Sequence, residues 1–190
     1  MSREPMLFPP NASTLRSSAA TRLRLSPVTL DDAAAVNRWK NDEELQLMSS
    51  DTFAPESLDG TRARLERWMA SDPDDIVHFA IRLVDAPSMI GFCHLAQVDR
   101  QNQSCKIGIV LGERQLWGQG LGSEAVGALV ERAFAQQLTR VGAEVYASNV
   151  RSIRMLERVG FEREGVLRRS VRRRGSWEDE LLYGLLAAER

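Results

Sequence analysis

The chain has 190 residues, of which 43% are hydrophobic, and its formal net charge is -1 at pH 7. This length and composition fit one domain with a sizeable core, and the near-zero charge excludes a global field that would attract nucleic acid. No apolar run is long enough to span a membrane, and the first residues lack the basic segment and apolar core of a secretory signal. These features predict a cytoplasmic protein.

Residues 1–20 mix Pro, Asn, Ser and Ala without periodicity, which predicts a flexible tail. Residues 21–190 are expected to form a single domain, whose elements follow from hydrophobic periodicity and turn residues. In chain order we expect a strand at 22–25, a helix from Thr29 to about Leu47, a helix at about 55–70, strands at 76–84, 89–98 and 104–111, a helix at 123–138, a strand at 141–147, a short helix at 149–160, and strands at about 161–172 and 177–186.

This order, β-α-α-β-β-β-α-β-α-β-β, predicts an α/β fold with a mixed sheet. The strand–helix–strand unit at 104–147 is a crossover, so its two strands are expected to be parallel. The other strands are expected to be mostly antiparallel.

The cysteines and histidines lie inside the predicted strands. Cys93 and Cys105 fall in consecutive strands, which would bring them near each other across an antiparallel pair, and we expect free, buried thiols. Neither has an adjacent base that would activate it as a nucleophile. His78 and His94 are interpreted as core or rim residues, and no spacing of His, Cys and acidic residues indicates a metal site.

The most informative stretch is Gln-Leu-Trp-Gly-Gln-Gly-Leu-Gly at 115–122, between a predicted strand and a predicted helix. Gly118, Gly120 and Gly122 let backbone amides point outward together, with no Cβ in the way. The helix that follows adds unpaired N–H groups and the positive end of its dipole. Such a turn is suited to a phosphate or a diphosphate.

Three ligand classes use a turn of this kind. A P-loop requires Gly-Lys-Ser/Thr, but residues 123–124 are Ser-Glu. A dinucleotide turn requires the spacing G-x-G-x-x-G and a carboxylate that ends the next strand, where residues 148–149 are Ser-Asn. The third class is coenzyme A, bound by turns of the type Gln/Arg-x-x-Gly-x-Gly/Ala, which Gln115, Gly118 and Gly120 match.

A second motif runs from Asn149 to Phe161. Asn149 is a good N-cap residue, and Gly160 stands where a helix ends in the left-handed region. Following the glycine-rich turn in this order, the motif resembles the GCN5-related N-acetyltransferases (GNAT), and within them the ribosomal-protein-alanine acetyltransferase branch. Glu-Gly at 164–165 and Gly-x-Trp-x-Asp at 175–179 are also similar to that branch. The resemblance covers about residues 22–189.

The resemblance implies acetyl transfer from acetyl-CoA, as co-substrate and without a metal, to a primary amine. The acceptor would be a protein N-terminus, a polyamine, an amino sugar or an antibiotic, and homodimers are frequent in the family. The two parallel strands would splay apart, and the pantetheine arm would pair with backbone in the gap. The expected coenzyme contacts are Ile109, Val110, Leu111, Gln115, Trp117, Gly118, Gln119, Gly120, Leu121, Gly122, Ser123, Asn149 and Ser152.

The catalytic residues are marked less clearly. A backbone N–H near Leu111 is expected to stabilise the oxyanion. Many family members have a tyrosine seven residues after the asparagine, where this chain has Leu156. Ser152 matches a serine that the ribosomal branch is thought to use near the sulfur, and capping of the helix is its equal alternative role.

Glu113, just beyond the strand, is the candidate general base, with a solvent-facing loop carboxylate as the alternative interpretation. Val171 stands where the ribosomal branch has a glutamate. Asp179, Glu178 and Asp99 are further candidates that would act through a water.

Five arginines crowd the last predicted hairpin: Arg168, Arg169, Arg172, Arg173 and Arg174. They form either a solvated face or the border of an acceptor pocket that selects an acidic substrate. Trp39 and Trp68 are candidates for the acceptor side. Two function hypotheses remain open, an N-acetyltransferase and a non-catalytic acetyl-CoA-binding sensor or interaction module.

Overall fold

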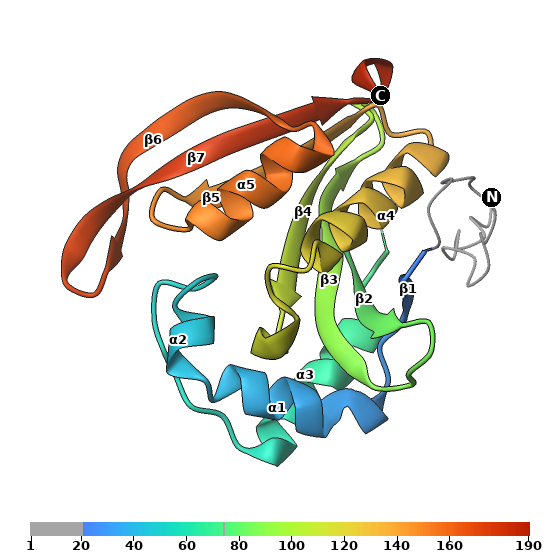
Figure 1. Ribbon diagram of the computed structural model, residues 1–190, viewed down its shortest axis with the longest axis vertical. Helices are drawn as coiled ribbons and strands as arrows, with labels where there is room; N and C mark the ends of the chain where they lie inside the picture. The colour runs from blue at the N-terminus through green and yellow to red at the C-terminus, as the bar shows by residue number, and fades with distance from the viewer. Residues whose placement is uncertain (1–20, 74) are drawn as a thin grey trace.

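A seven-stranded sheet of order β1-β2-β3-β4-β5-β7-β6 forms the centre of the computed structural model (Figure 1). The structure describes residues 21–73 and 75–190, so the tail expected over residues 1–20 lies outside it. The strands are β1 (Leu23–Pro27), β2 (Ile76–Leu83), β3 (Met89–Asp99), β4 (Ser104–Leu111), β5 (Arg140–Tyr146), β6 (Glu162–Arg173) and β7 (Ser176–Leu186). Only β4 and β5 are parallel neighbours among these strands. The predicted α/β fold with a mixed sheet is confirmed.

Five α-helices cover the two faces of the sheet in the described chain. They are α1 (Ala33–Lys40), α2 (Glu43–Gln46), α3 (Leu58–Met69), α4 (Leu121–Ala135) and α5 (Val150–Val159). On one face, α4 and α5 pack on a core that includes Cys93, Leu129 and Leu185. On the other face, α1 and α3 enclose a smaller core around Trp39 and Phe92. Alternation along β3 sends Phe92 and Cys93 to opposite faces, which separates the two cores.

The prediction of one long helix from Thr29 to Leu47 is wrong. The structure divides it into a 3-10 turn, α1 and α2. The break falls at Asp42, which is extended (φ -89°, ψ 101°) and accepts a hydrogen bond from the N–H of Leu45 at 3.0 Å. A carboxylate at this position caps a new helix more favourably than it continues the old one.

The parallel strands β4 and β5 stay paired over only three residue pairs. These are Ser104 with Arg140, Cys105 with Val141, and Lys106 with Gly142. Beyond them β4 continues to Leu111 beside β3, whereas β5 follows β7 along its whole length. The splay implied by the resemblance is therefore present, and it leaves a gap in the middle of the sheet.

The cysteines are free and buried, as predicted. Burial raises the pKa of Cys105 to about 11 and that of Cys93 further. They are not cross-strand partners, because Cys93 lies opposite Ile109. Within residues 21–73 and 75–190, no helix has the length and apolar character that crossing a membrane requires.

His78 on β2 is stacked on Trp68 of α3 and lies beside His94 of β3. Its ring lies parallel to that of Trp68, with centroids 4.3 Å apart, and 5.4 Å from the ring of His94. No described residue accepts or donates a hydrogen bond at its buried Nδ1. Burial, with a smaller contribution from His94, lowers the pKa of His78 to about 4.

This histidine makes the fold sensitive to acid. An unfolded histidine titrates near pH 6.5, so between that pH and about 4 the unfolded chain binds a proton that folded His78 does not. The free energy of unfolding therefore falls as the pH decreases through this window. In His78→Phe, which keeps the stack on Trp68, urea midpoints should fall less between pH 7 and pH 5 than in the wild type. Parallel pH profiles for the two proteins would contradict this account.

Candidate functional site

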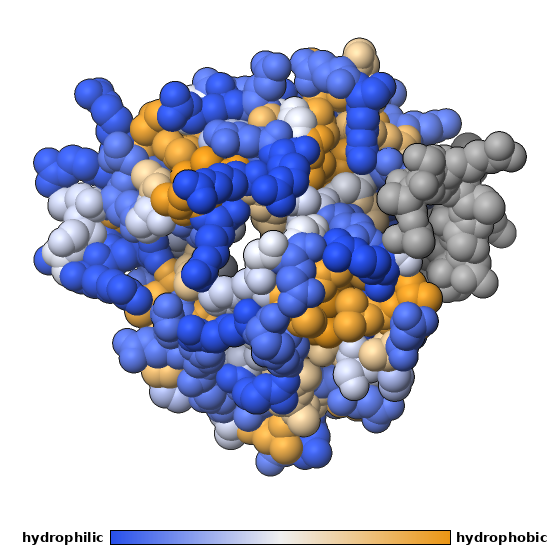
Figure 2. All heavy atoms as spheres, in the orientation of Figure 1, coloured by the Kyte–Doolittle hydropathy of each residue, from blue (hydrophilic) through white to orange (hydrophobic). Residues whose placement is uncertain are grey.

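A cavity of about 850 Å³ occupies the gap between β4 and β5 and is lined from both faces of the sheet. Figure 2 shows a hollow near the centre of one face, bordered by hydrophilic side chains. On the α4 and α5 side the wall includes Leu121, Gly122, Ser123, Ser152 and Met155. On the opposite side it includes Lys40, Gln46, Trp68, Phe92, His94 and Glu180. Two reactants can therefore enter from opposite faces and meet between the strands.

The edge of β4 presents backbone groups to this gap. The N–H of Gly112 donates to the carbonyl of Ile90 at 3.0 Å, which makes these two residues a hydrogen-bonded pair. Because such pairs alternate in an antiparallel ladder, the N–H and C=O groups of Leu111 and Ile109 face away from β3, into the gap. The carbonyl of Leu111 accepts from Trp117 Nε1 at 2.8 Å. The N–H groups of Ile109 and Leu111 are therefore positioned to pair with an added strand.

The glycine-rich turn after β4 has the geometry that its sequence predicts. Gly118 has φ +77° and Gly120, the N-cap of α4, has φ +82°, a region that favours glycine. Gly122 lies against α5, since a Cβ there would come within 2.9 Å of Met155 Sδ. The first hydrogen bond of α4 runs from the Glu124 N–H to the Gly120 carbonyl at 3.1 Å. The N–H groups of residues 121–123 precede it and border the cavity, as an anion site requires.

Most of the expected coenzyme contacts line this cavity. They are Ile109, Val110, Leu111, Trp117, Gly118, Gly120, Leu121, Gly122, Ser123, Asn149 and Ser152. Gln115 and Gln119 are exceptions. The side chain of Gln119 donates to the Gln115 carbonyl at 2.9 Å, and that of Gln115 donates to Glu113 at 2.9 Å. The two glutamines brace the turn from outside.

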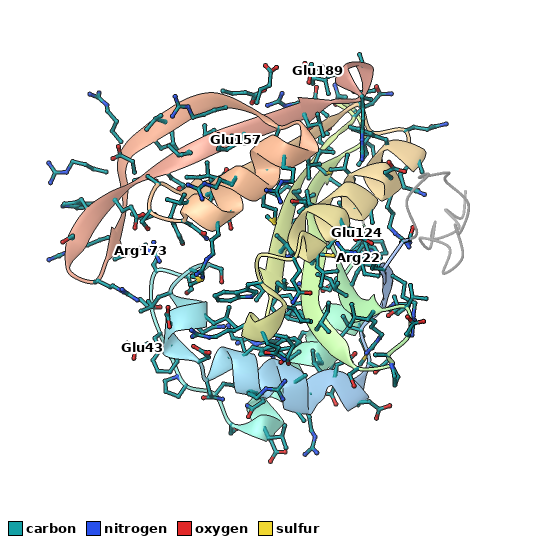
Figure 3. The ribbon with its side chains drawn as sticks, in the orientation of Figure 1. Arg22, Glu43, Glu124, Glu157, Arg173 and Glu189 are labelled. Carbon is teal, nitrogen blue, oxygen red and sulfur yellow. The ribbon has the colours of Figure 1, made fainter. Side chains whose placement is uncertain are left out.

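An ion pair flanks the turn. Arg22, just before β1, pairs with Glu124 in the first turn of α4 at 3.0 Å, and the two lie side by side in Figure 3. The Arg22 guanidinium also lies 3.5 Å from where a Cβ of Gly120 would be. This arginine compensates the carboxylate in the first turn of α4.

Glu113 is not brought into the cavity. Its carboxylate accepts from Trp39 Nε1 at 3.2 Å and from Gln115, and it forms an ion pair with Arg38 of α1. Burial raises the pKa of Glu113, but the hydrogen bonds from Gln115, Arg38 and Trp39 outweigh it and hold the pKa below its usual value. A carboxylate whose basicity is lowered and which is bound to α1 outside the cavity is a poor general base for a reaction in the gap.

The other three carboxylates that we considered as bases also have partners elsewhere. Asp179 accepts from the N–H of Arg169 at 2.8 Å. Glu178 pairs with Arg173 at 2.7 Å, and Asp99 accepts from Asn102 in a hairpin. None of the three lines the cavity between β4 and β5.

The sequence left open whether Asn149 or Ser152 caps α5, and the structure assigns the cap to Asn149. The Asn149 side chain caps α5 by accepting from the N–H of Ser152 at 3.1 Å, and it donates to the Met48 carbonyl at 3.1 Å. The Ser152 hydroxyl is therefore not the cap, and the residue borders the cavity. Gly160 ends the helix at φ +106°. Leu156, where many family members have tyrosine, is buried in the core.

His94 and Glu180 line the cavity and were not found from the sequence as site residues. The imidazole of His94 lies over Gly108 of β4, because a Cβ there would come within 2.3 Å of its Cε1. Burial lowers the pKa of His94. Glu180 lies opposite Tyr146 of β5 and accepts from Ser170 Oγ at 2.9 Å. Only the strand order shows that these residues border the gap.

Lys40 lines the same wall and donates to Gln46 Oε1 at 2.6 Å. Burial, with a contribution from Arg64, lowers the pKa of Lys40. The described residues contain no group of three or more His, Cys, Asp or Glu side chains that could hold a metal ion.

The chain is similar in sequence and in fold to known proteins. The model of the acetyltransferase (GNAT) domain family matches residues 22–162. An uncharacterised N-acetyltransferase p20 from Bacillus licheniformis is 31% identical over 173 residues, which are 88% of this chain and 94% of that protein. The ribosomal protein uS5-alanine N-acetyltransferase of Escherichia coli is 31% identical over 111 residues, 57% of this chain and 56% of the enzyme. The structure of Mycobacterium smegmatis RimJ in complex with CoA-disulfide has a TM-score of 0.77 at 26% identity, with 88% of this chain and 83% of that chain covered.

The turn at Gly120 can be tested by substitution. Gly120→Glu places a side chain and a negative charge at the N-terminus of α4, where an anion would lie. We expect its affinity for coenzyme A, measured by calorimetry, to fall at least a hundredfold, roughly 2.7 kcal/mol. Gly120→Ala is the matched control, since it carries the backbone strain of about 1–2 kcal/mol without the charge. Equal affinities of the two variants would show that the anion binds elsewhere.

Proposed function

This chain belongs to the GNAT acetyltransferase family, and we propose that it transfers the acetyl group of acetyl-CoA to a primary amine by direct attack in a ternary complex. The observation that carries this proposal is the cavity between β4 and β5, which is lined from both faces of the sheet and has an anion cradle at its edge. The acceptor amine belongs to a peptide N-terminus, a polyamine, an amino sugar or an antibiotic.

The backbone positions the thioester. In this proposal the N–H groups of residues 121–123 bind the diphosphate, and the Ile109–Leu111 edge of β4 pairs with the extended arm. The N–H of Leu111 points into the gap and donates to the carbonyl oxygen as it becomes negative. Alignment of the two bound reactants contributes most of the remaining acceleration, roughly 7–11 kcal/mol in well-oriented systems.

Ser152 assists the departing thiolate in this scheme, because its hydroxyl has no part in the helix cap. Ser152→Ala should lower kcat more than it raises the KM for acetyl-CoA, by about tenfold or more if one hydrogen bond to a charged group is lost. Thermal unfolding should be unchanged, since Asn149 still caps α5. If Ser152→Ala lowers the thermal stability enough to explain its lower activity, the role of Ser152 is structural.

We assign the general base to His94. Its ring lies over Gly108, next to the backbone that would hold the thioester, on the face from which the acceptor enters. Because burial lowers its pKa, the imidazole is neutral at physiological pH and has a lone pair for the proton of the incoming ammonium.

The pH profile tests this assignment. His94 must be neutral to act, so wild-type kcat/KM should decrease on the acid side of pH 6.5 as the imidazole is protonated. His94→Gln should lose this dependence and lower kcat by about a hundredfold or more, with unchanged affinity for acetyl-CoA. Glu180→Gln is the comparison variant. If Glu180→Gln removes the acid limb and His94→Gln keeps it, the base is Glu180.

The function itself is tested by release of free coenzyme A across a panel of peptides, polyamines and amino sugars. Acetyl transfer to any of these amines above the rate of hydrolysis supports the enzyme. Tight binding of acetyl-CoA without turnover on the whole panel would instead support the non-catalytic sensor or interaction module.

A further inference from the structure

A second cavity, of about 780 Å³, lies beside the first. It is bounded by α2 and the loop after it, by the N-terminus of α5, and by the hairpin that joins β6 to β7. Its lining residues are Glu44, Leu47, Met48, Ser148, Asn149, Val150, Arg151, Arg173, Arg174 and Glu178. Met48, Asn149 and Arg151 also line the cavity between β4 and β5, so the two spaces share a wall.

Arg173 is the unusual residue of this second cavity. It is only 9% exposed, although it lies near the tip of a surface hairpin, between that hairpin and α2 (Figure 3). Its guanidinium lies 3.9 Å from the ring centroid of Tyr146, and its Nη1 donates to Glu178 at 2.7 Å. No described residue accepts from its buried Nε. A buried arginine whose donors are incompletely used is costly unless a ligand supplies acceptors.

The carboxylates of this cavity are already compensated. Glu178 accepts from Arg173 and from the N–H of Ser148 at 2.8 Å, and Glu44 pairs with Arg114 at 2.6 Å. These contacts lower the pKa of Glu178 despite its burial.

Two cations of the same wall have no carboxylate partner among the described residues. Arg151 is stacked 4.7 Å from the ring centroid of Trp117, and Arg174 is exposed at the hairpin turn. With Arg173, the lining of this cavity contains three arginines and two carboxylates, which is a surplus of positive charge.

We propose that this cavity binds a carboxylate of the acceptor, and that the preferred acceptor is an acidic peptide whose N-terminal amine reaches the gap between β4 and β5. The inference rests on the proposed acetyl transfer and adds a substrate class to it. Arginine suits a carboxylate because its planar donors bind both oxygens.

The acceptor explains the position of this site better than the coenzyme does. None of the residues 118–123, which form the anion cradle, lines the second cavity. Tyr146 connects the second cavity to the acceptor wall, because it lies under Arg173 and borders the first cavity. A peptide with an acidic side chain near its N-terminus can therefore reach both spaces at once.

The hairpin supplies its own control. Arg172 is adjacent to Arg173 in sequence, is exposed and lines neither cavity. Arg172→Gln removes the same charge from the same hairpin without changing the proposed site, so it should leave the selectivity unchanged.

The experiment compares two peptides that differ only by Glu or Gln at their second and third positions. The wild type should have a higher kcat/KM for the Glu peptide, and Arg174→Gln should reduce this preference by about tenfold. Arg173→Gln should reduce it further, and Arg173→Lys should restore only part of it. Equal rates of wild type on both peptides would overturn the inference and leave the proposed acetyl transfer intact.

Two further measurements separate the remaining outcomes. Binding of the labelled Glu peptide, followed by fluorescence anisotropy in the presence of coenzyme A, should weaken in Arg174→Gln but not in Arg172→Gln. This result would support the site even if no peptide were acetylated. The absence of acetylation would count against the proposed function and not against the site. If Arg174→Gln raises the KM for acetyl-CoA but not for acetyl-dephospho-CoA, the site binds the coenzyme phosphate and the inference is wrong.

Discussion

The separation of β4 from β5 after three residue pairs is the constraint on which the rest of the site depends. Each strand is paired along its other edge, β4 with β3 and β5 with β7, so moving either strand across the opening would disturb an existing ladder. Backbone groups that face the opening are obligatory hydrogen-bonding groups. Trp117 satisfies one of them, the Leu111 carbonyl, and the N–H groups beside it remain suited to an extended ligand. The fold thus presents a strand-shaped opening between β4 and β5, bordered by unpaired backbone groups.

The electrostatics of the site follow from the same geometry. The N-terminus of α4 attracts an anion through its unpaired N–H groups and its dipole, and Glu124 in its first turn would repel that anion. Arg22, just before the edge strand β1, binds this carboxylate with both its backbone N–H and its guanidinium. Because the helix lies across the sheet, an arginine one hundred residues earlier in the chain can protect the anion site from a local charge.

Local signals were enough to predict the parts of the site that local geometry builds. The glycines of the turn, the cap at Asn149 and the end of α5 at Gly160 all depend on residues within one helical turn. The sequence did not indicate side-chain directions that depend on distant elements. Glu113 follows β4 as expected, yet Arg38 and Trp39 of a helix far earlier in the chain turn its carboxylate away from the gap. His94 occurs in an ordinary strand pattern, and only the pairing of β3 with β4 places it over Gly108.

The arginines of the last hairpin show the same limit at the level of specificity. Five of them occur within seven residues, and the sequence alone gives no reason to separate them. In the structure four are exposed, while irregular register between Leu167 and Val171 bends β6 and Arg173 is enclosed over Tyr146. Water and salt screen a charge on a solvated face, so an exposed arginine that lines no cavity, such as Arg172, contributes little to selecting a ligand. In the proposed acceptor site, Arg173 is withdrawn from water and would act at low dielectric, so the bend of β6 distinguishes this arginine from its neighbours in a way that the number of charges does not.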